Sequence, residues 1–340
     1  MLTLAAVTML PVFADVDTGV DDAFALVYLL ASADAELVGV ASTGGNVDVD
    51  QVCRNNLGLL ALCGATGIPV SRGAARPLVA PMRTAEDTHG PAGLGYAELP
   101  SATTGLTDYD AAEAWVRAAR RHDGALVGLV TGPLTNLALA LRAEPDLPRL
   151  LRRLVIMGGS FEYRGNTTPV SEWNVSVDPE AAAEVFDAWG RAADDVGVEE
   201  LPIVCGLNLT ENVMMTPEIM ARLANAAGST APDVNPLIRV LDDAMRFYFE
   251  FHESVGEGYL AHLHDPLAAA VALDPALIQT RNATVAVELT GTLTRAMTIA
   301  DWSGHWGRPP NARVGVEGDA AVFFERFIER VGPFARRVHS

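Results

Sequence analysis

Apolar, β-prone segments alternate with amphipathic segments along most of the chain, and this alternation constrains the fold more than any other feature. The expected strands are Leu10–Ala14, Leu37–Ser42, Leu126–Val130, Leu154–Met157 and Ile203–Cys205. The expected helices between them are Asp22–Ser32, Val49–Cys63, Ala111–Arg121, Leu134–Ala143 and Pro179–Trp189. Because each crossover between parallel strands covers a face of the sheet, the pattern predicts an α/β fold with an open, mostly parallel central sheet flanked by helices.

The remainder of the chain is organised less regularly. A helical pattern runs from Pro232 to Val255, and a closing helix is expected over Ala320–Val331. The strand-like segments between them are Thr284–Leu289, Met297–Ala300 and Val314–Glu317. The sequence has no internal repeat and no linker, so we expect one catalytic domain over residues 1–340.

Two long loops, 73–100 and 158–173, are rich in glycine and polar residues. Long loops within a compact domain are often binding loops. Ligands of open α/β sheets bind at the carboxyl ends of the strands. Chemistry is therefore expected just after the strands named above.

The charge balance narrows the class of partner. The chain has 24 Lys+Arg against 43 Asp+Glu, a formal net charge of −19. Such a surface repels phosphate backbones and anionic lipids, so neither a nucleic acid polymer nor a membrane is expected as a partner. A small neutral substrate or a cation fits better. All basic residues are arginines, which excludes lysine chemistry.

Cysteine usage and the start of the chain indicate a cytoplasmic protein. Cys53, Cys63 and Cys205 are an odd set without C-x-x-C spacing, which is typical of reduced, buried thiols. The apolar segment Met1–Ala14 is similar to a signal peptide but has no basic residue before its apolar run. We interpret it as leading into the first core strand.

An acidic turn follows that strand. Asp15, Asp17, Asp21 and Asp22 fall within eight residues, with Gly19 between the two pairs. Packed together, four carboxylates repel one another strongly, and a bound hard cation such as Ca²⁺ or Mg²⁺ relieves this repulsion. A solvated turn capping the next helix is the simpler interpretation, but it explains one aspartate better than four.

Structured alternatives for this turn differ in what they require. An EF-hand needs an oxygen ligand at its twelfth position, where this chain has Leu26. A phosphatase of the haloacid dehalogenase type also carries D-x-D after its first strand and would use Asp15 as its nucleophile. A sugar- or nucleoside-binding protein without catalysis is a third possibility.

The turn most closely resembles the D-x-D-x-G-x-D-D signature of the nucleoside hydrolase family, whose five fixed positions are all present. Further segments resemble motifs of the same family and occur in order along most of the chain. They are Ser42 to Asn46, Thr131 to Asn136, Val155 to Gly159 followed by Asn166, Glu172 and Asn174, and His264-Asp265-Pro266, with His89 in the first long loop. The resemblance implies a Rossmann-like nucleoside hydrolase fold and hydrolysis of the N-glycosidic bond of ribonucleosides.

The resemblance also implies a calcium site and a set of ribose contacts. Asp17, Asp22, Asp265 and the carbonyl of Thr131 would hold Ca²⁺ at about 2.3–2.6 Å. A calcium-bound water would attack C1′, with Asp17 as the general base. The residues expected to contact the ribose are Asp21, Asn46, Met157, Asn166, Glu172 and Asn174, while Asp15 supports the turn from behind.

Departure of the base requires a hydrogen bond or a proton. His264 is the expected acid, and His89 is a second candidate contact. The roles of His252, Tyr259 and His262 and the base preference are left open by the sequence. The family is often dimeric or tetrameric, so a homodimer or homotetramer is expected.

Overall fold

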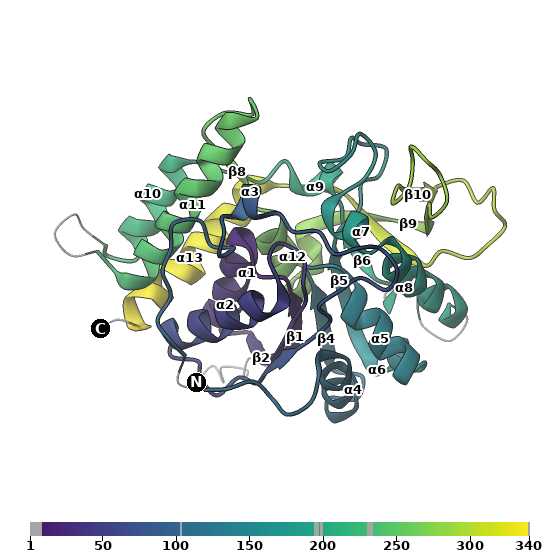
Figure 1. Cartoon of the computed structure of the whole chain (residues 1–340), viewed down its shortest axis with the longest axis horizontal. Helices are drawn as coiled ribbons and strands as arrows, with labels where there is room; N and C mark the ends of the chain where they lie inside the picture. The colour runs from purple at the N-terminus through teal and green to yellow at the C-terminus, as the bar shows by residue number, and fades with distance from the viewer. Residues whose placement is uncertain (1–8, 103, 194–196, 198–199, 230–233, 339–340) are drawn as a thin grey trace, which may run out of the picture.

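The computed structural model describes residues 9–102, 104–193, 197, 200–229 and 234–338. Its main sheet has nine strands in the order β10-β9-β11-β6-β5-β4-β1-β2-β3 (Figure 1). The strands are β1 (Leu10–Val16), β2 (Ala35–Ser42), β3 (Val70–Arg72), β4 (Leu126–Val130), β5 (Leu151–Met157), β6 (Ile203–Cys205), β9 (Ile278–Val287), β10 (Thr298–Asp301) and β11 (Ala312–Gly318). A second, two-stranded sheet pairs β7 (Met214–Met215) with β8 (Ala261–His262).

Parallel pairing runs from β3 to β11, whereas β9 and β10 pair antiparallel at one edge. The helices are α1 (Val20–Ala31), α2 (Val49–Leu62), α3 (Glu86–His89), α4 (Ala111–Arg121), α5 (Thr135–Ala143), α6 (Leu147–Leu150), α7 (Trp173–Val177), α8 (Pro179–Ala192), α9 (Leu207–Thr210), α10 (Pro217–Ala226), α11 (Pro236–Ser254), α12 (His264–Leu273) and α13 (Ala320–Val338). The predicted open, mostly parallel sheet flanked by helices is confirmed.

Alternate residues of the central strands pack into separate cores. Val12, Ala14 and Val16 of β1 join the core formed with α1, α11, α12 and α13, whereas Phe13 joins the core formed with α4, α5 and α8. This alternation is the two-residue period of a strand. Figure 1 shows α10, α11 and α13 on one side of the sheet and α4, α5 and α8 on the other. Covered on both faces, the sheet presents its carboxyl ends as the place for a site.

Several elements differ from the sequence prediction. The segment from His264 begins α12, and all ten of its residues are buried, so it has no polar face that would reveal a helix. Strand β3 has three residues and was not predicted. Helix α13 continues through Pro333 to Val338, and α11 begins at Pro236, after its N-cap Asn235. Pro232, where the prediction began, lies outside the described residues.

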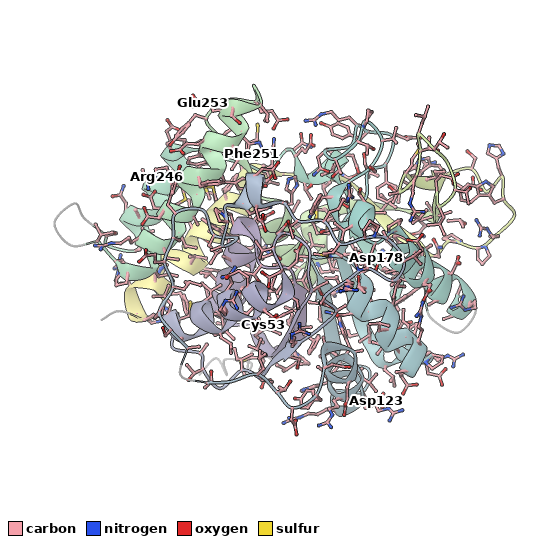
Figure 2. All side chains as sticks on the ribbon, viewed as in Figure 1. Cys53, Asp123, Asp178, Arg246, Phe251 and Glu253 are labelled. Atoms are coloured by element: carbon pink, nitrogen blue, oxygen red, sulfur yellow. The ribbon has the colours of Figure 1, made fainter. Side chains whose placement is uncertain are left out.

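The start of α8 agrees with its sequence signal. Asp178, labelled in Figure 2, is the N-cap. Its carboxylate accepts hydrogen bonds from the Ala181 N–H at 3.1 Å and from the Thr135 hydroxyl at 2.6 Å. Met1 to Thr8, which precede β1, lie outside the described residues. Among the helices that are described, none has the length and apolar character needed to cross a membrane.

A hydrogen bond from Trp115 of α4 to Asp15 connects the helices on one face of the sheet to the acidic turn. The contribution of this bond to stability can be measured. The Trp115 indole N–H donates to Asp15 Oδ2 at 2.7 Å, and both side chains are fully buried. We expect Trp115→Phe to lower the free energy of unfolding by about 1–3 kcal/mol more than Trp189→Phe, because it removes a partner of a buried carboxylate. Urea unfolding measures both.

Trp189 is a matched control, since it is fully buried in the same core and its indole N–H has no hydrogen-bond partner among the described residues. Equal losses in the two variants would contradict a stabilising role for the bond to Asp15.

Candidate active site

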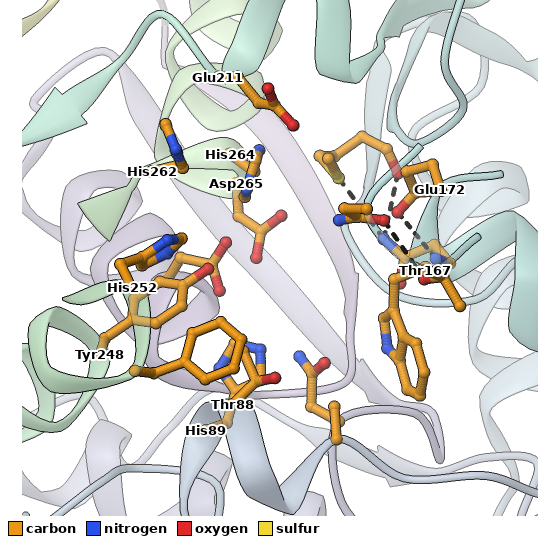
Figure 3. Close-up of a pocket in the computed structure, with 18 of the residues that line it drawn as sticks. Thr88, His89, Thr167, Glu172, Glu211, Tyr248, His252, His262, His264 and Asp265 are labelled. Carbon is orange, nitrogen blue, oxygen red and sulfur yellow. Dashed lines mark hydrogen bonds between the residues drawn. The ribbon is translucent and has the colours of Figure 1, made fainter. Parts of the chain in front are cut away.

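A cavity of about 480 Å³ opens at the carboxyl ends of the parallel strands (Figure 3). Its wall combines the loops after β2, β4 and β5 with α1, α3, α11 and α12. Of the residues predicted for the site, those that line the cavity are Asp21, Asn46, His89, Thr131, Met157, Asn166, Glu172, Asn174, His264 and Asp265. Asp15, Asp17 and Asp22 are not among the lining residues, and each is fully buried.

The acidic turn is held by backbone geometry. Asp15 lies in β1, and Asp21 and Asp22 lie in the first turn of α1, where carboxylates are favoured by the helix dipole. Asp22 Oδ2 accepts a hydrogen bond from the N–H of Gly19, the N-cap, at 2.8 Å. This bond fixes Asp22 against the turn that joins the strand to the helix.

Asp17 has one oxygen bonded and one free. Its Oδ2 accepts the Asn46 N–H at 2.8 Å, whereas its buried Oδ1 has no hydrogen-bond partner among the described residues. Two glycines surround it. A Cβ at Gly45 would lie 2.0 Å from Asp17 Oδ2, and one at Gly132 would lie 3.1 Å from Asp17 Oδ1. The backbone therefore packs directly against this carboxylate, and only glycine leaves it room.

Asp21, Asp22 and Asp265 converge, each offering an oxygen within 4.8 Å of the other two. Burial, and next the charge of Asp22, raise the pKa of Asp21 to about 7. Burial, and next the charge of Asp21, raise the pKa of Asp265 well above its usual value. For Asp17 the pKa is also raised strongly, by burial and then by Asp22. A cation among these oxygens would favour their charged forms, so the donor set fits a hard metal ion.

Thr131 links this cluster to the loop after β5. Its hydroxyl donates to Asp22 Oδ1 at 2.7 Å, and its carbonyl accepts from Asn174 Nδ2 at 2.6 Å. Asn174 Oδ1 is buried without a partner in the described part of the chain. Thr131 and Asn174 thus form a continuous wall between the acidic cluster and the cavity.

Both carboxylate oxygens of Asp15 accept hydrogen bonds from neighbouring elements of the fold. Oδ1 accepts from Thr43 Oγ1 at 2.7 Å and from Asn136 Nδ2 at 2.9 Å, and Oδ2 accepts from Trp115. Burial raises its pKa, and these three donors oppose the shift. The residue joins β1 to the loop after β2, to α4 and to α5.

Glu172 and Asn166 occupy different parts of the loop. Glu172 caps α7, accepting the N–H groups of Gly159, Asn174 and Val175 at 2.9, 2.7 and 3.0 Å. It is buried, whereas Asn166 is exposed at the cavity. Met157 ends β5 and is buried, with its sulfur 3.5 Å from Asn174 Nδ2.

Two buried histidines flank the cluster (Figure 3). His89 enters the site, and its Nδ1 accepts the Val20 N–H at 3.1 Å, which places its proton on Nε2. Burial, with the nearby His252, lowers the pKa of His89 to about 3. His264 Nδ1 lies 2.7 Å from Thr210 Oγ1, and burial lowers its pKa well below the usual value. Both imidazoles are neutral at pH 7.

The three residues whose roles the sequence left open differ in whether they line the cavity. His252 and His262 line the cavity, whereas Tyr259 does not; it is 43% exposed and packs on Phe249. The structure adds lining residues that sequence reasoning missed, namely Arg164, Glu211, Tyr248, Phe251 and Glu257. Tyr248, Phe251 and His252 share one face of α11, and their spacing of three and four residues was the available signal.

Fold and site together define an α/β enzyme that acts on a small molecule at a buried carboxylate cluster. The chain belongs to the inosine-uridine preferring nucleoside hydrolase family, whose model matches residues 12–325. It is 37% identical to the pyrimidine-specific ribonucleoside hydrolase RihA of Enterobacter sp. (strain 638), over 96% of this chain and 99% of the relative.

Two solved structures also resemble it. The purine-preferring ribonucleoside hydrolase from Gardnerella vaginalis has a TM-score of 0.86 and 29% identity, covering 96% of this chain and 99% of that one. The plant nucleoside hydrolase PpNRh1 has a TM-score of 0.84 and 28% identity, covering 95% and 99%. The chain is accordingly an N-glycosidase that hydrolyses ribonucleosides.

The close packing around Asp17 generates a prediction. Gly45→Ala should displace the Asp17 carboxylate, because the added Cβ would lie 2.0 Å from its Oδ2. We expect kcat/KM on ribonucleosides to fall roughly 100-fold, the usual cost of a displacement of about 1 Å in an active site. Gly67→Ala, where nothing lies within 4 Å of the added atom, is the control and should retain full activity. Unchanged kinetics in Gly45→Ala would mean that the position of Asp17 is not critical.

Proposed function

We propose that the enzyme is a calcium-dependent ribonucleoside hydrolase that prefers pyrimidine ribonucleosides. The observation that carries the calcium proposal is the free, buried Oδ1 of Asp17 beside the converging Asp21, Asp22 and Asp265. Asp17, Asp22, Asp265 and the Thr131 carbonyl would hold the ion, an all-oxygen set that suits Ca²⁺. When bound, the ion supplies positive charge that orients the ribose hydroxyls and makes water more acidic.

Asp17 acts as the general base. Asp17 takes a proton from a water molecule as the water oxygen bonds to C1′. The N-glycosidic bond breaks, and the electron pair of that bond passes to the departing nucleobase. Because the transition state of glycosidic cleavage is oxocarbenium-like, the surrounding carboxylates stabilise its positive charge. A carboxylate oxygen has two lone pairs, so Oδ1, which has no partner among the described residues, can hold the ion and still accept the proton of the water.

The remaining polar lining residues position the sugar. Asp21, Asn46 and Asn174 bind ribose hydroxyls, and the unpartnered Oδ1 atoms of Asn46 and Asn174 support this assignment. Asn166, Glu172 and Met157 form the part of the wall assigned to the 5′-hydroxyl. Glu172 acts mainly by capping α7, because its oxygens already accept three backbone N–H groups.

The leaving base receives its proton or hydrogen bond from the histidine side of the cavity. His264 is the proposed acid, and His89 presents a second N–H from Nε2. Since both are neutral at pH 7, each donates a hydrogen bond that strengthens as negative charge builds on the base.

Pyrimidine preference rests on the RihA relatives, which are named for it. The phosphatase alternative is disfavoured because both oxygens of Asp15, its nucleophile, already accept hydrogen bonds from Thr43, Asn136 and Trp115. A homodimer or homotetramer, a cytoplasmic location and a single domain remain predictions.

Release of free base and ribose from uridine, cytidine, inosine and adenosine tests the proposal. We expect uridine and cytidine to be cleaved with higher kcat/KM than the purine nucleosides, and activity to disappear after chelation and return with added Ca²⁺. Activity that persists in fully metal-stripped protein would contradict the calcium proposal. Ligand binding without any turnover, with calcium present, would identify a binding protein that lacks catalysis.

His264→Ala separates leaving-group assistance from the rest of the mechanism. We expect kcat on uridine to fall about 10²–10⁴-fold, the range for a positioned acid, with a much smaller loss on 4-nitrophenyl riboside, whose leaving group needs no proton. His305→Ala, at an exposed position, is the control. Equal losses on the two substrates would remove His264 from this role.

A further inference from the structure

A second group of potential metal ligands lies on the cavity wall away from the acidic turn. His252 of α11, His262 of β8 and Glu257 between them each offer a ligand atom within 4.8 Å of the other two. His252 Nδ1 lies 2.8 Å and His262 Nε2 lies 3.4 Å from the same oxygen, Glu257 Oε2. Figure 3 shows His252 and His262 on the same side of the cavity, beside Asp265.

These distances match the ligand shell of a tetrahedral metal. Zinc binds histidine nitrogen and carboxylate oxygen at about 2.0–2.1 Å, which places neighbouring ligands of a tetrahedron roughly 3.3 Å apart. The contacts of 2.8 and 3.4 Å lie on either side of that value. Only small side-chain adjustments would therefore let an ion replace the hydrogen between His252 and the carboxylate and bring His262 into its ligand shell.

The surroundings keep the carboxylate aimed at the histidines. Arg164 contacts the other oxygen, Glu257 Oε1, at 3.2 Å and also contacts Glu211 at 2.8 Å, which leaves Oε2 to the imidazoles. His252 and His262 are 6% and 8% exposed, and their outer ring nitrogens, Nε2 and Nδ1, have no hydrogen-bond partner among the described residues. Within the described part of the chain, each imidazole thus makes its one hydrogen bond or ion pair to the same carboxylate oxygen.

The donor chemistry differs from that of the acidic cluster. Imidazole nitrogen suits borderline ions such as Zn²⁺, whereas an all-carboxylate and carbonyl set suits Ca²⁺. Three protein ligands also leave a fourth position for water or a ligand, the usual arrangement of an open zinc site.

We propose that His252, Glu257 and His262 form a binding site for a zinc-like divalent cation, distinct from the calcium site. All three side chains line the cavity, so an ion held there reduces the space for a substrate and raises KM. This effect on turnover rests on the proposed function, whereas binding of the ion does not.

Metal binding is measured on the full chain saturated with Ca²⁺, which fills the acidic cluster. Titration with Co²⁺ should produce the visible bands of a four-coordinate ion, and Zn²⁺ should abolish them. Equilibrium dialysis should find one equivalent of Zn²⁺ bound in addition to Ca²⁺. Absence of both signals at micromolar metal would overturn the proposal, whatever the enzyme does with nucleosides.

Variants locate the ion. Glu257→Gln is the safest, because this side chain is 32% exposed, and it should weaken zinc binding by roughly tenfold or more, since loss of even an outer partner of a metal site costs about 10–100-fold. His262→Gln should abolish the cobalt bands. His305→Gln and Glu98→Gln make the same chemical changes at exposed positions outside the triad and should bind zinc like the parent protein. Equal zinc affinity in Glu257→Gln, His262→Gln and the controls would place the ion elsewhere and refute the site.

Discussion

Repulsion among buried carboxylates is the interaction on which the rest of this structure depends. Asp17, Asp21, Asp22 and Asp265 are each at most 4% exposed. The groups that donate hydrogen bonds to Asp17 and Asp22 are neutral: the backbone N–H of Gly19 and Asn46, the side-chain amide of Asn46 and the hydroxyl of Thr131. Neutral donors offset only part of the cost of burying charge. The folded state must therefore hold protons or a cation here, and binding of a cation at this cluster would be coupled to folding.

The scaffold resists this repulsion by fixing each carboxylate from a different element. The parallel ladder places β1 between β2 and β4, so that the residues following all three strands meet at one edge. Asp15 spans the sheet and the helical layer through Trp115, while Gly45 and Gly132 confine Asp17 from opposite segments. A site made from strand ends is more rigid than one made from loops alone. This rigidity lets a strained, like-charged cluster persist.

The sequence predicted site residues best where a short pattern of side chains along the chain also forms part of the functional site. The turn from Asp15 to Asp22 follows an apolar strand, and both its position and its convergence with Asp265 were expected. The sequence also predicted His264 and Asp265 as site residues and a helical segment over Pro232–Val255, but it did not predict α12 as a helix or Tyr248 as a lining residue. Helix α12 is apolar all round, so no periodicity marked it, and Tyr248 reaches the cavity only because α11 packs across α1. Contacts of that kind depend on tertiary packing, which a short sequence window does not contain.

The cavity thus has two chemically distinct sides. Strand ends and the first turn of α1 supply the oxygen-rich side, and α3, α11 and β8 supply imidazole and aromatic rings, among them His89 packed on Tyr248. Relatives of the same fold are named for pyrimidine and for purine preference. If the reaction belongs to the oxygen-rich side, base preference can change through the other side without disturbing the carboxylates. The sheet positions only the first side, whereas the second, which includes the proposed leaving-group contact His89, is positioned by the packing of α3 and α11.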